Sequence, residues 1–356
     1  MNVFQLNSNR RTLLASVTAL ALCSTPSISA AQNKNVYLLS WGGTVQTMLE
    51  KDGWADRFKE ETGYTVTLVP KATSAEIIAA AIAQKAKPQV DVVMCDLPAW
   101  YQGDGQNIFT KLDPAKIPNL EKMVPSARIG DKGVAPYADV LTIVYNPETF
   151  KKNGWAKPTS ISDLARPEFK GKLVFPPISH TYGMYGLIEL ARANGGSEHN
   201  MDPGFEALKK IAPSVVDWTS THAKLAGMFQ QGTVAVALYA NASTQDMRTR
   251  GANVEGITPN PSYLSSTVAG IMDNAPNPEG ANVLLNWLIS KNVLTYRAEK
   301  LGNTPLNRDV KPTGPIGETV MTGKDLEKLL QVDYPAVLKY RKSWNERFER
   351  EILPIR

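Results

Sequence analysis

The chain has 356 residues, of which 43% are hydrophobic and 21% are charged, and its net charge is +5. These values indicate a globular protein that is long enough for two domains. The excess of positive charge is small and no block of Lys or Arg carries it, so nothing in the sequence favours nucleic acid as a partner.

The first 31 residues have the pattern of a secretory signal peptide. Arg10 and Arg11 give a positive start, Leu13 to Leu22 is an apolar run too short for a lasting membrane span, and Ser29-Ala30-Ala31 offers small residues for cleavage. We therefore expect export to the periplasm. The alternative to a signal peptide is a disordered or membrane-anchoring tail. Two details of the signal peptide also stay open, namely export by the twin-arginine route and a lipid anchor on Cys23.

Cleavage after residue 31 would remove two arginines and no acid, so the net charge would fall from +5 to about +3. It would also remove Cys23, which leaves Cys95 as the only thiol and excludes an intrachain disulfide. A chain of this length buries enough apolar surface to fold without one.

Strand-like and helix-like segments alternate after this leader. Apolar runs predict strands over 35–40, 64–70 and 89–94, and helices are predicted over 45–62, ending at Gly63, and over 74–85, capped by Ser74. This order implies parallel strands, and ligands bind such sheets at the carboxyl ends of the strands. Trp41-Gly42-Gly43-Thr44 and Cys95-Asp96 follow two of the strands, so we expect them on one edge.

The most specific pattern lies between Tyr137 and Pro177. The apolar run from Val140 to Tyr145 predicts a strand that ends at Asn146-Pro147, and a short polar helix follows. Ser160 and Asp163 then have the spacing of a capping box. The sequence PEFKGK at 167–172 ends that helix, and a strand is predicted over 173–175.

This segment resembles the entry into the second lobe of bacterial periplasmic solute-binding proteins, in particular the spermidine/putrescine-binding-like group of ABC importer receptors. In that family a strand ending in Tyr-Asn-Pro crosses between the lobes, and a stretch of the form P-T-S-x-x-D-L-x-x-P-E-[FY]-K-G-K starts the second lobe. The chain has nearly every element, with Ile161 where an aromatic residue is common. Residues 302–307 are similar to the family's G-x-x-P-x-N element, and the resemblance covers most of the chain after about residue 35.

The resemblance implies an α/β fold of two lobes, the type II periplasmic binding protein fold, in which each lobe is a mainly parallel sheet flanked by helices and hinge strands join the lobes. We expect residues 32–139 and 270–356 in lobe 1 and residues 140–269 in lobe 2. In lobe 2, strands are predicted over 214–218 and 234–239, and helices over 184–194, 205–212, 222–231 and from Ser243. The chain then returns through 267–271 to helices over 279–290 and 293–301 and to a helical tail, 323–352, expected to wrap lobe 1.

Candidate ligand-binding residues follow the strand ends of both lobes. They are Trp41, Gly43, Thr44 and Asp96 in lobe 1, Ser179, Thr181, Tyr182, Trp218, Tyr239 and Asn241 in lobe 2, and Ser265 and Thr304 near the return. Each residue type has a structural alternative. The aromatic residues can be core residues, the glycines can form only a tight turn, and the Asp, Ser and Thr residues can be helix caps.

The distribution of acids bears on the ligand. Members of the family that bind polyamines place several acidic and aromatic residues around the ammonium groups. Here the aromatic residues are present, but the loops 176–185 and 261–267 contain no acid, which leaves Asp96 as the one acid at an expected strand end. A buried dication without matched carboxylates would cost several kcal/mol. We therefore expect a small amine-bearing solute with one anionic group, which is amino-acid-, opine- or aminophosphonate-like, and the anion can lie at a helix N-terminus. A polyamine is the alternative that the resemblance favours.

Two rival functions differ in class. For a secreted hydrolase the sequence offers only three histidines, no Gly-x-Ser-x-Gly and no zinc motif, so we expect neither catalytic residues nor a metal or other cofactor. A ferric-ion receptor on the same fold stays open, because Tyr182, Tyr185 and His180 are ligands suited to Fe(III). As a binding receptor, the protein would have two partners, a small-molecule solute and the membrane permease of an ABC importer, and it would act as a monomer.

Overall fold

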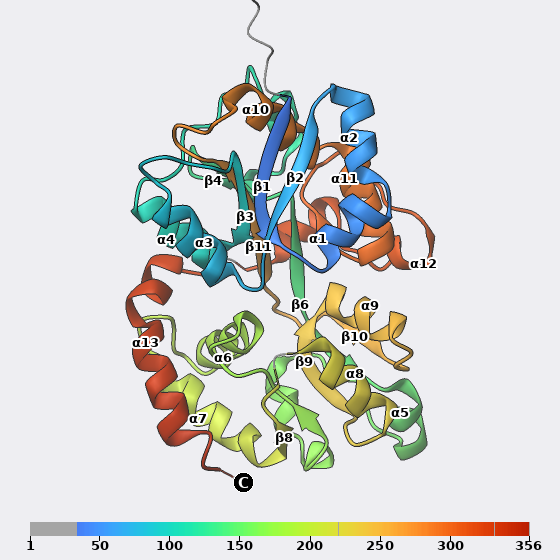
Figure 1. Cartoon of the computed structure of the whole chain (residues 1–356). Helices are drawn as coiled ribbons and strands as arrows, with labels where there is room; N and C mark the ends of the chain where they lie inside the picture. Colours follow the sequence, from blue (N-terminus) through green and yellow to red (C-terminus); the bar gives the residue numbers. More distant parts are fainter. Residues whose placement is uncertain (1–33, 220, 331, 356) are drawn as a thin grey trace, which may run out of the picture. The chain divides into compact units, whose positions relative to one another are not determined.

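The computed structural model describes residues 34–219, 221–330 and 332–355 as a mixed α/β chain with two groups of strands (Figure 1). The predicted signal peptide lies outside these residues. Within them, no helix combines the length and the apolar character needed to cross a membrane.

The first group of strands forms the sheet that the sequence predicts. β1 (Asn35–Trp41) lies between β2 (Thr65–Lys71) and β3 (Val92–Asp96) and pairs with both in parallel. β11 (Leu264–Ile271) runs antiparallel to β3 and places Thr267 beside Asp96. The short strands β5 (Gly133–Val134) and β4 (Arg128–Ile129) continue from β11. Three predicted strands are thus confirmed within a few residues, and we call this sheet and its helices the first lobe.

The helices of the first lobe connect these strands and cover the sheet. They are α1 (Thr44–Gln46), α2 (Trp54–Thr62), α3 (Ser74–Ala83), α4 (Leu97–Gly105), α10 (Pro278–Leu288), α11 (Lys291–Tyr296) and α12 (Gly314–Gly317). Short 3-10 turns lie at Pro118–Lys122, Pro125–Ala127 and Gly323–Lys328, and a π-helical segment at Arg297–Leu301 follows α11.

Two details of the predicted helices are wrong. The helix expected over 45–62 is interrupted, because the π-helical segment Thr47–Lys51 leads into a turn at Gly53, whose φ of 75° suits glycine. The helix does end at Gly63, as expected. The cap of α3 is Thr73, whose side chain accepts a hydrogen bond from Glu76 N, and not Ser74.

The second group of strands belongs to the second lobe. β9 (Val236–Ala240) pairs antiparallel with β6 (Tyr137–Tyr145) and parallel with β7 (Leu173–Val174), which in turn pairs with β8 (Val215–Asp217). β10 (Glu255–Ile257) pairs with the other edge of β6. The helices of this lobe are α5 (Pro147–Asn153), α6 (Thr181–Ala193), α7 (Asp202–Ile211), α8 (His222–Gln230) and α9 (Asn241–Thr249), and 3-10 turns lie at Ile161–Ala165, Pro167–Phe169 and Ala212–Ser214. The capping box of Ser160 and Asp163 is present as predicted.

β6 and β11 join the two lobes. β6 pairs with β11 and β12 (Thr304–Pro305) over residues 137–140, and with β9 and β10 over residues 141–145. β11 likewise changes its partner from β6 to β3 between Ser266 and Thr267. Figure 1 shows β6 running from one group of strands into the other. The predicted crossing and return strands are therefore both present, whereas the lobe limits at 139/140 and 269/270 stay a prediction.

The C-terminal helix α13 (Tyr334–Glu351) corrects the prediction that the tail wraps the first lobe. Figure 1 shows α13 alongside α6 and α7. Its Phe348 packs edge-on against Trp218 at 5.0 Å between ring centroids, and its Arg347 forms an ion pair with Asp202. Its first residue, Tyr334, contacts a first-lobe ring, that of Tyr101 in α4. The apolar face of α13 therefore packs mainly on the second lobe.

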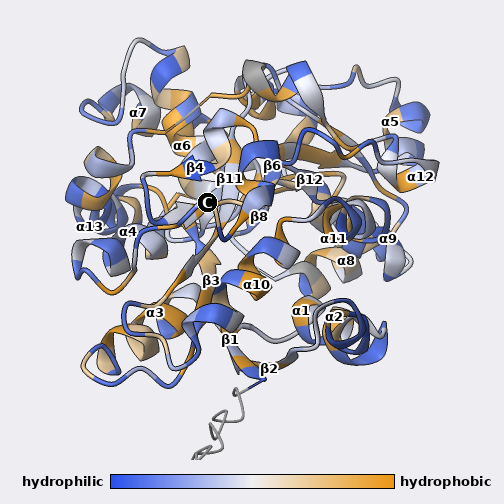
Figure 2. Ribbon diagram, turned by 90° about the horizontal axis from the view of Figure 1, so that it is seen from above, coloured by the Kyte–Doolittle hydropathy of each residue, from blue (hydrophilic) through white to orange (hydrophobic). Residues whose placement is uncertain are grey.

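Apolar side chains fill the space between the sheets and their helices. Leu38, Val92 and Val93 in the first lobe and Leu238 in the second are fully buried, as is the thiol of Cys95. Figure 2 shows the hydrophobic colour on central strands such as β3 and hydrophilic colour on outer helices such as α2 and α13. Burial of these runs stabilises both sheets and leaves the strand ends for polar residues.

Candidate functional site

A polar cavity of about 370 Å³, here called the main cavity, lies where the carboxyl ends of β1 and β3 meet β6 and α9. Its lining includes Trp41, Thr44, Asp96, Tyr137, Asp139, Ser243, Gln245, Asp246, Thr249, Thr267, Arg297, Lys300 and Asn303. The walls therefore come from both lobes, on either side of the crossing strands.

The charged residues of the main cavity are three acids, Asp96, Asp139 and Asp246, and two bases, Arg297 and Lys300. Asp246 of α9 pairs with Arg250, the residue that follows the helix, at 2.8 Å. Asp96 forms no ion pair with a basic side chain among the residues that the structure describes, and Asp139 accepts hydrogen bonds from neutral side chains.

Asp96 ends β3 and is held by Ser74. The Ser74 hydroxyl donates to Asp96 Oδ2 at 2.8 Å and accepts from the Asp96 N–H at 3.2 Å. Burial raises the pKa of Asp96 to about 6, and the nearby charge of Asp139 acts in the same direction, against the hydrogen bond from Ser74 and the charge of Arg341. Burial away from water and the second carboxylate thus make the charged form of Asp96 unfavourable.

Asp139 is the centre of a chain of hydrogen bonds between the lobes. Its Oδ2 accepts from the Tyr182 hydroxyl of α6 at 2.9 Å, and its Oδ1 accepts from Asn303 Nδ2 at 2.9 Å. The Asn303 Oδ1 in turn accepts from Arg297 Nη2 at 2.9 Å. Burial, together with Asp139, raises the pKa of Tyr182 well above its usual value, so Tyr182 stays a hydrogen-bond donor.

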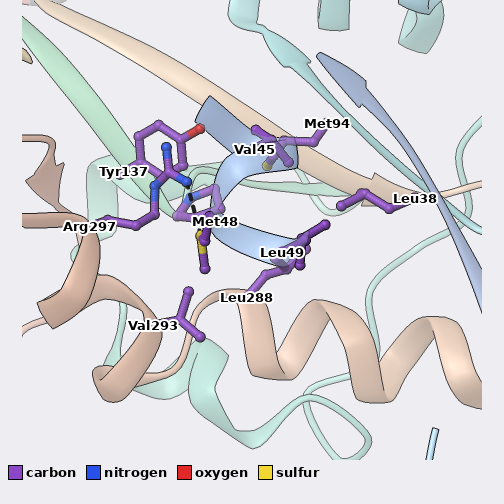
Figure 3. A pocket seen from close by; sticks show the side chains of 10 residues that line it. Leu38, Val45, Met48, Leu49, Met94, Tyr137, Leu288, Val293 and Arg297 are labelled. Carbon is purple, nitrogen blue, oxygen red and sulfur yellow. Dashed lines mark hydrogen bonds between the residues drawn. The ribbon is translucent and has the colours of Figure 1, made fainter. Parts of the chain in front are cut away.

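Arg297 forms one wall of the main cavity. Its guanidinium carbon lies 3.7 Å from the centroid of the Tyr137 ring, and Nη1 donates to the thioether sulfur of Met48 at 3.5 Å. Figure 3 shows the guanidinium group over the Tyr137 ring, beside an apolar pocket that includes Leu38, Val45 and Leu288. The aromatic ring and the aliphatic neighbours hold the arginine side chain in one orientation.

A second cavity of about 420 Å³ lies on the other side of Asp96, which lines both cavities. Ser74 of α3, the segment from Ser179 to Thr181 before and at the start of α6, and Arg341 of α13 also line it. Arg341 Nη2 donates to the carbonyl oxygen of Ser179 at 2.6 Å. The C-terminal helix therefore contributes a basic residue to the region between the lobes.

Three aromatic rings gather behind Asp139. The Tyr182 ring lies 5.2 Å from Tyr239 and 5.1 Å from His180, measured between centroids. Tyr239 is fully buried, and burial raises the pKa of its hydroxyl group. The ring of Tyr239 thus supports Tyr182 from the core side.

The predicted site residues have different surroundings in the structure. Trp41, Thr44 and Asp96 line the main cavity, and Ser179 and Thr181 line the second cavity. Tyr182 reaches the main cavity through Asp139, whereas Tyr239 lies behind it.

The remaining predicted residues have structural contacts. Gly43 precedes α1 with a φ of 57°, and Trp218 packs between Phe175 and Phe348 and lines neither cavity. Asn241 accepts from Val140 N and donates to Gly302 O and to the Thr304 hydroxyl, so its amide ties α9 to the hinge region. Ser265 lies opposite Asp139 in the pairing of β11 with β6. The cap of α6 is His180, whose ring nitrogen accepts from Tyr182 N, and not Ser179 or Thr181.

The expectation that Asp96 is the one well-placed acid is wrong, because Asp139 and Asp246 also line the main cavity. Asp139 escaped notice because it lies one residue before the apolar run at Val140, although β6 begins at Tyr137. Arg297 and Asn303 carry no local signal, since they precede the strand β12 on a helical segment and a loop. Arg341 lies on α13, and the sequence does not indicate that this helix packs on the second lobe.

The side chains named for a ferric ion do not share one site. The Tyr185 hydroxyl bonds to the Tyr334 hydroxyl, whereas the Tyr182 hydroxyl donates to Asp139. Among the residues that the structure describes, no group of three or more His, Cys, Asp or Glu side chains is arranged to hold a metal ion. The elevated pKa of Tyr182 also opposes the phenolate form that Fe(III) prefers.

Residues 53–321 match the sequence profile of the family described as bacterial extracellular solute-binding protein. Two relatives are similar over most of their length. One is the spermidine/putrescine-binding periplasmic protein of Escherichia coli, 25% identical over 305 residues, with 83% of each chain covered. The other is a Salmonella typhimurium periplasmic protein whose name proposes 2-aminoethylphosphonate as its ligand, 24% identical over 321 residues, with 84% of this chain and 86% of that protein covered.

Solved structures share the fold at lower identity. An ABC transporter protein from Clostridium perfringens has a TM-score of 0.75 at 24% identity, with 89% of this chain and 99% of that chain covered. An ABC transporter substrate-binding protein from Bradyrhizobium japonicum has a TM-score of 0.74 at 21% identity, with 90% of this chain and 100% of that chain covered. The predicted two-lobed periplasmic binding protein fold is therefore confirmed.

Proposed function

The chain belongs to the family of bacterial extracellular solute-binding proteins, and we propose that it is the receptor of an ABC importer whose solute carries a protonated amine, held by Asp96 and Asp139. The coarse function, capture of a small solute for import, follows from the family. The experiment below tests the finer part of the proposal, which is that the solute has an amine and that Asp96 and Asp139 bind it.

The pair of carboxylates in the main cavity is the observation that carries this proposal. Burial and the charge of Asp139 raise the pKa of Asp96 to about 6, so the charge of Arg341 compensates ionised Asp96 only in part. An ammonium group beside both acids would complete this compensation. Each hydrogen bond from it to a carboxylate would be worth about 1.5–3 kcal/mol, the usual range for bonds to charged groups.

The names of the relatives support the same chemical group. Spermidine, putrescine and 2-aminoethylphosphonate all contain a primary amine, although they differ at the other end. The indole of Trp41 lines the main cavity and can add a cation–π contact to an ammonium group.

The position of the acids also suits a two-lobed receptor. Asp96 belongs to the first lobe, Asp139 lies on the crossing strand β6, and Tyr182 of the second lobe bonds to Asp139. A solute held at these residues would favour closure of the lobes about β6 and β11, and a closed protein is the form that we expect the membrane permease to recognise. We propose that the receptor acts as a monomer in the periplasm.

Calorimetric titration of residues 32–356 tests whether the protein binds a solute that carries an amine. The probes are putrescine, spermidine, 2-aminoethylphosphonate and γ-aminobutyrate at pH 7.5. We expect at least one to bind in the micromolar range or tighter. Asp96→Asn and Asp139→Asn should each weaken that binding by at least about tenfold, because each removes a charge-assisted hydrogen bond.

The matched control is Asp56→Asn, which removes the same charge from an exposed position on α2. It should bind like the unchanged protein. Equal binding by Asp96→Asn, Asp139→Asn and the control would show that the amine is held elsewhere.

A further inference from the structure

We propose that the solute also carries an anionic group, such as a carboxylate or a phosphonate, and that Arg297 binds this group in the main cavity with help from Lys300. This inference rests on the proposed function, because it concerns the other end of the same solute. Its basis is a buried arginine that has no acidic partner among the residues that the structure describes.

Arg297 is only 5% exposed, and among the described residues no carboxylate forms an ion pair with it. Its hydrogen bonds go to the Asn303 amide oxygen and to the weak acceptor sulfur of Met48, and its buried Nε has no acceptor. Buried arginines are normally paired, because an uncompensated charge in a low-dielectric site is costly. A group from outside the chain would complete this arrangement.

Stacking on Tyr137 does not replace the missing anion. The guanidinium carbon lies 3.7 Å from the ring centroid, so the ring fixes the orientation of the guanidinium group, but its face offers no oxygen acceptor. Figure 3 shows the two groups side by side. A fixed guanidinium group is suited to a carboxylate or a phosphonate, because its N–H groups match two oxygens at once. The stack therefore prepares the arginine for an anion.

Asn303 keeps the positive and negative ends of the main cavity apart. Its amide bonds to Arg297 through oxygen and to Asp139 through nitrogen, so the two charged groups are linked without forming an ion pair. An acid at position 303 would have paired directly with the arginine. With the amide in place, Arg297 can pair with an anion, and Asp139 lies near Asp96 for the amine.

Lys300 strengthens the positive end. It lies three residues after Arg297 on the same π-helical segment, is exposed, and lines the main cavity. The acid across the cavity, Asp246, is paired with Arg250. A polyamine would place its second ammonium group close to two cations, whereas an amine with an acid at its far end would match both ends.

Two pairs of compounds with equal chains test the anion. γ-Aminobutyrate and putrescine share a four-carbon chain and differ in one end group, and 2-aminoethylphosphonate and ethylenediamine share a two-carbon chain. Calorimetric titration at pH 7.5 should show the acid-bearing member of at least one pair binding tenfold or more tightly than its diamine. Arg297→Gln should remove most of this preference, and Lys300→Gln should reduce it.

Lys291→Gln is the matched control, because it removes the same charge from an exposed position on the neighbouring helix α11. It should keep the full preference. Thermal unfolding will show whether Arg297→Gln folds. If it does not, the inference is tested by Lys300→Gln, which should show a smaller preference for the acid-bearing compound than Lys291→Gln does.

Three outcomes would overturn the inference, and they separate it from the proposed function. Diamines that bind as tightly as their partners would refute the anion and leave the amine receptor intact. A preference that survives in Arg297→Gln would place the anion elsewhere, with Arg341 of the second cavity as the next residue to change. Failure of every amine to bind would refute the proposed function, and the inference with it.

Discussion

At the scale of single residues, the buried carboxylate of Asp96 lowers the stability of the folded protein when it is ionised. Its pKa of about 6 in the folded protein lies above the usual value of 3.8, because burial and the charge of Asp139 oppose ionisation. The folded state therefore holds the proton of Asp96 more tightly than the unfolded state does. Stability from this group is present below about pH 4 and is lost as the pH rises through about 6.

Asp96→Asn should therefore stabilise the solute-free protein at pH 8. The full pKa shift of Asp96 corresponds to a gain of about 3 kcal/mol in the free energy of unfolding. We expect a gain of about 2 kcal/mol, because Asp96 is partly exposed and water screens its charge. An amide keeps the acceptor for Ser74 and removes the charge. Urea unfolding at pH 4, 6 and 8 would show the gain increasing with pH, whereas Asp56→Asn should show no such trend. A gain equal at pH 4 and pH 8 would contradict the assigned cause.

Residues of the site differ in how far the sequence predicts them. Asp96 and Trp41 could be found because parallel strands bring their carboxyl ends to one edge, and that order can be read along the chain. Arg297 and Asp139 could not, since their role depends on Asn303 and on a fold that brings together residues more than 150 positions apart. Long-range contacts of single polar residues leave no periodic signal.

At the scale of elements, most strands and helices follow from local patterns, and the errors lie where tertiary contacts decide. The tail is predicted to be helical over 323–352, and in the structure Gly323–Lys328 is a 3-10 turn and α13 covers Tyr334–Glu351. The amphipathic pattern of α13 says only that one face is apolar. Which lobe receives that face depends on complementary rings, here Trp218 and Phe205, against which Phe348 and Arg347 of α13 pack.

Phe348→Ala should loosen α13 from the second lobe. Phe348 is 3% exposed, and truncation of a buried phenylalanine costs about 3–5 kcal/mol where the space cannot close. We expect the free energy of unfolding to fall by about 3 kcal/mol, the lower end of this range, because the helix lies at the surface. The fluorescence of Trp218 should also change. Leu338→Ala on the same helix is the control, because Leu338 is 39% exposed and should cost less than about 1 kcal/mol. Equal losses in the two variants would show that α13 does not depend on this contact.

At the scale of the whole molecule, the resemblance to solute-binding proteins predicted the fold and the crossing strands. It did not predict the ligand. The fold sets where two lobes meet, whereas the solute is chosen by a few side chains that the fold can vary without losing stability. In this chain we propose that those side chains are two acids and an arginine, with one asparagine between Asp139 and the arginine.

Binding should make the molecule more compact, because the proposed solute would contact residues of both lobes. A compact chain of 325 residues, the length after predicted cleavage, has a radius of gyration of about 20 Å. Small-angle scattering should give a larger value without solute and a decrease toward 20 Å when 2-aminoethylphosphonate or putrescine saturates the protein. A ligand at 100 times its Kd should also raise the free energy of unfolding by about 2.7 kcal/mol. For Asp96→Asn, binding at least tenfold weaker limits this gain at the same concentration to about 1.4 kcal/mol or less. If the radius stays constant although calorimetry shows binding, then the solute binds without closure, and the residues of one lobe must hold it alone.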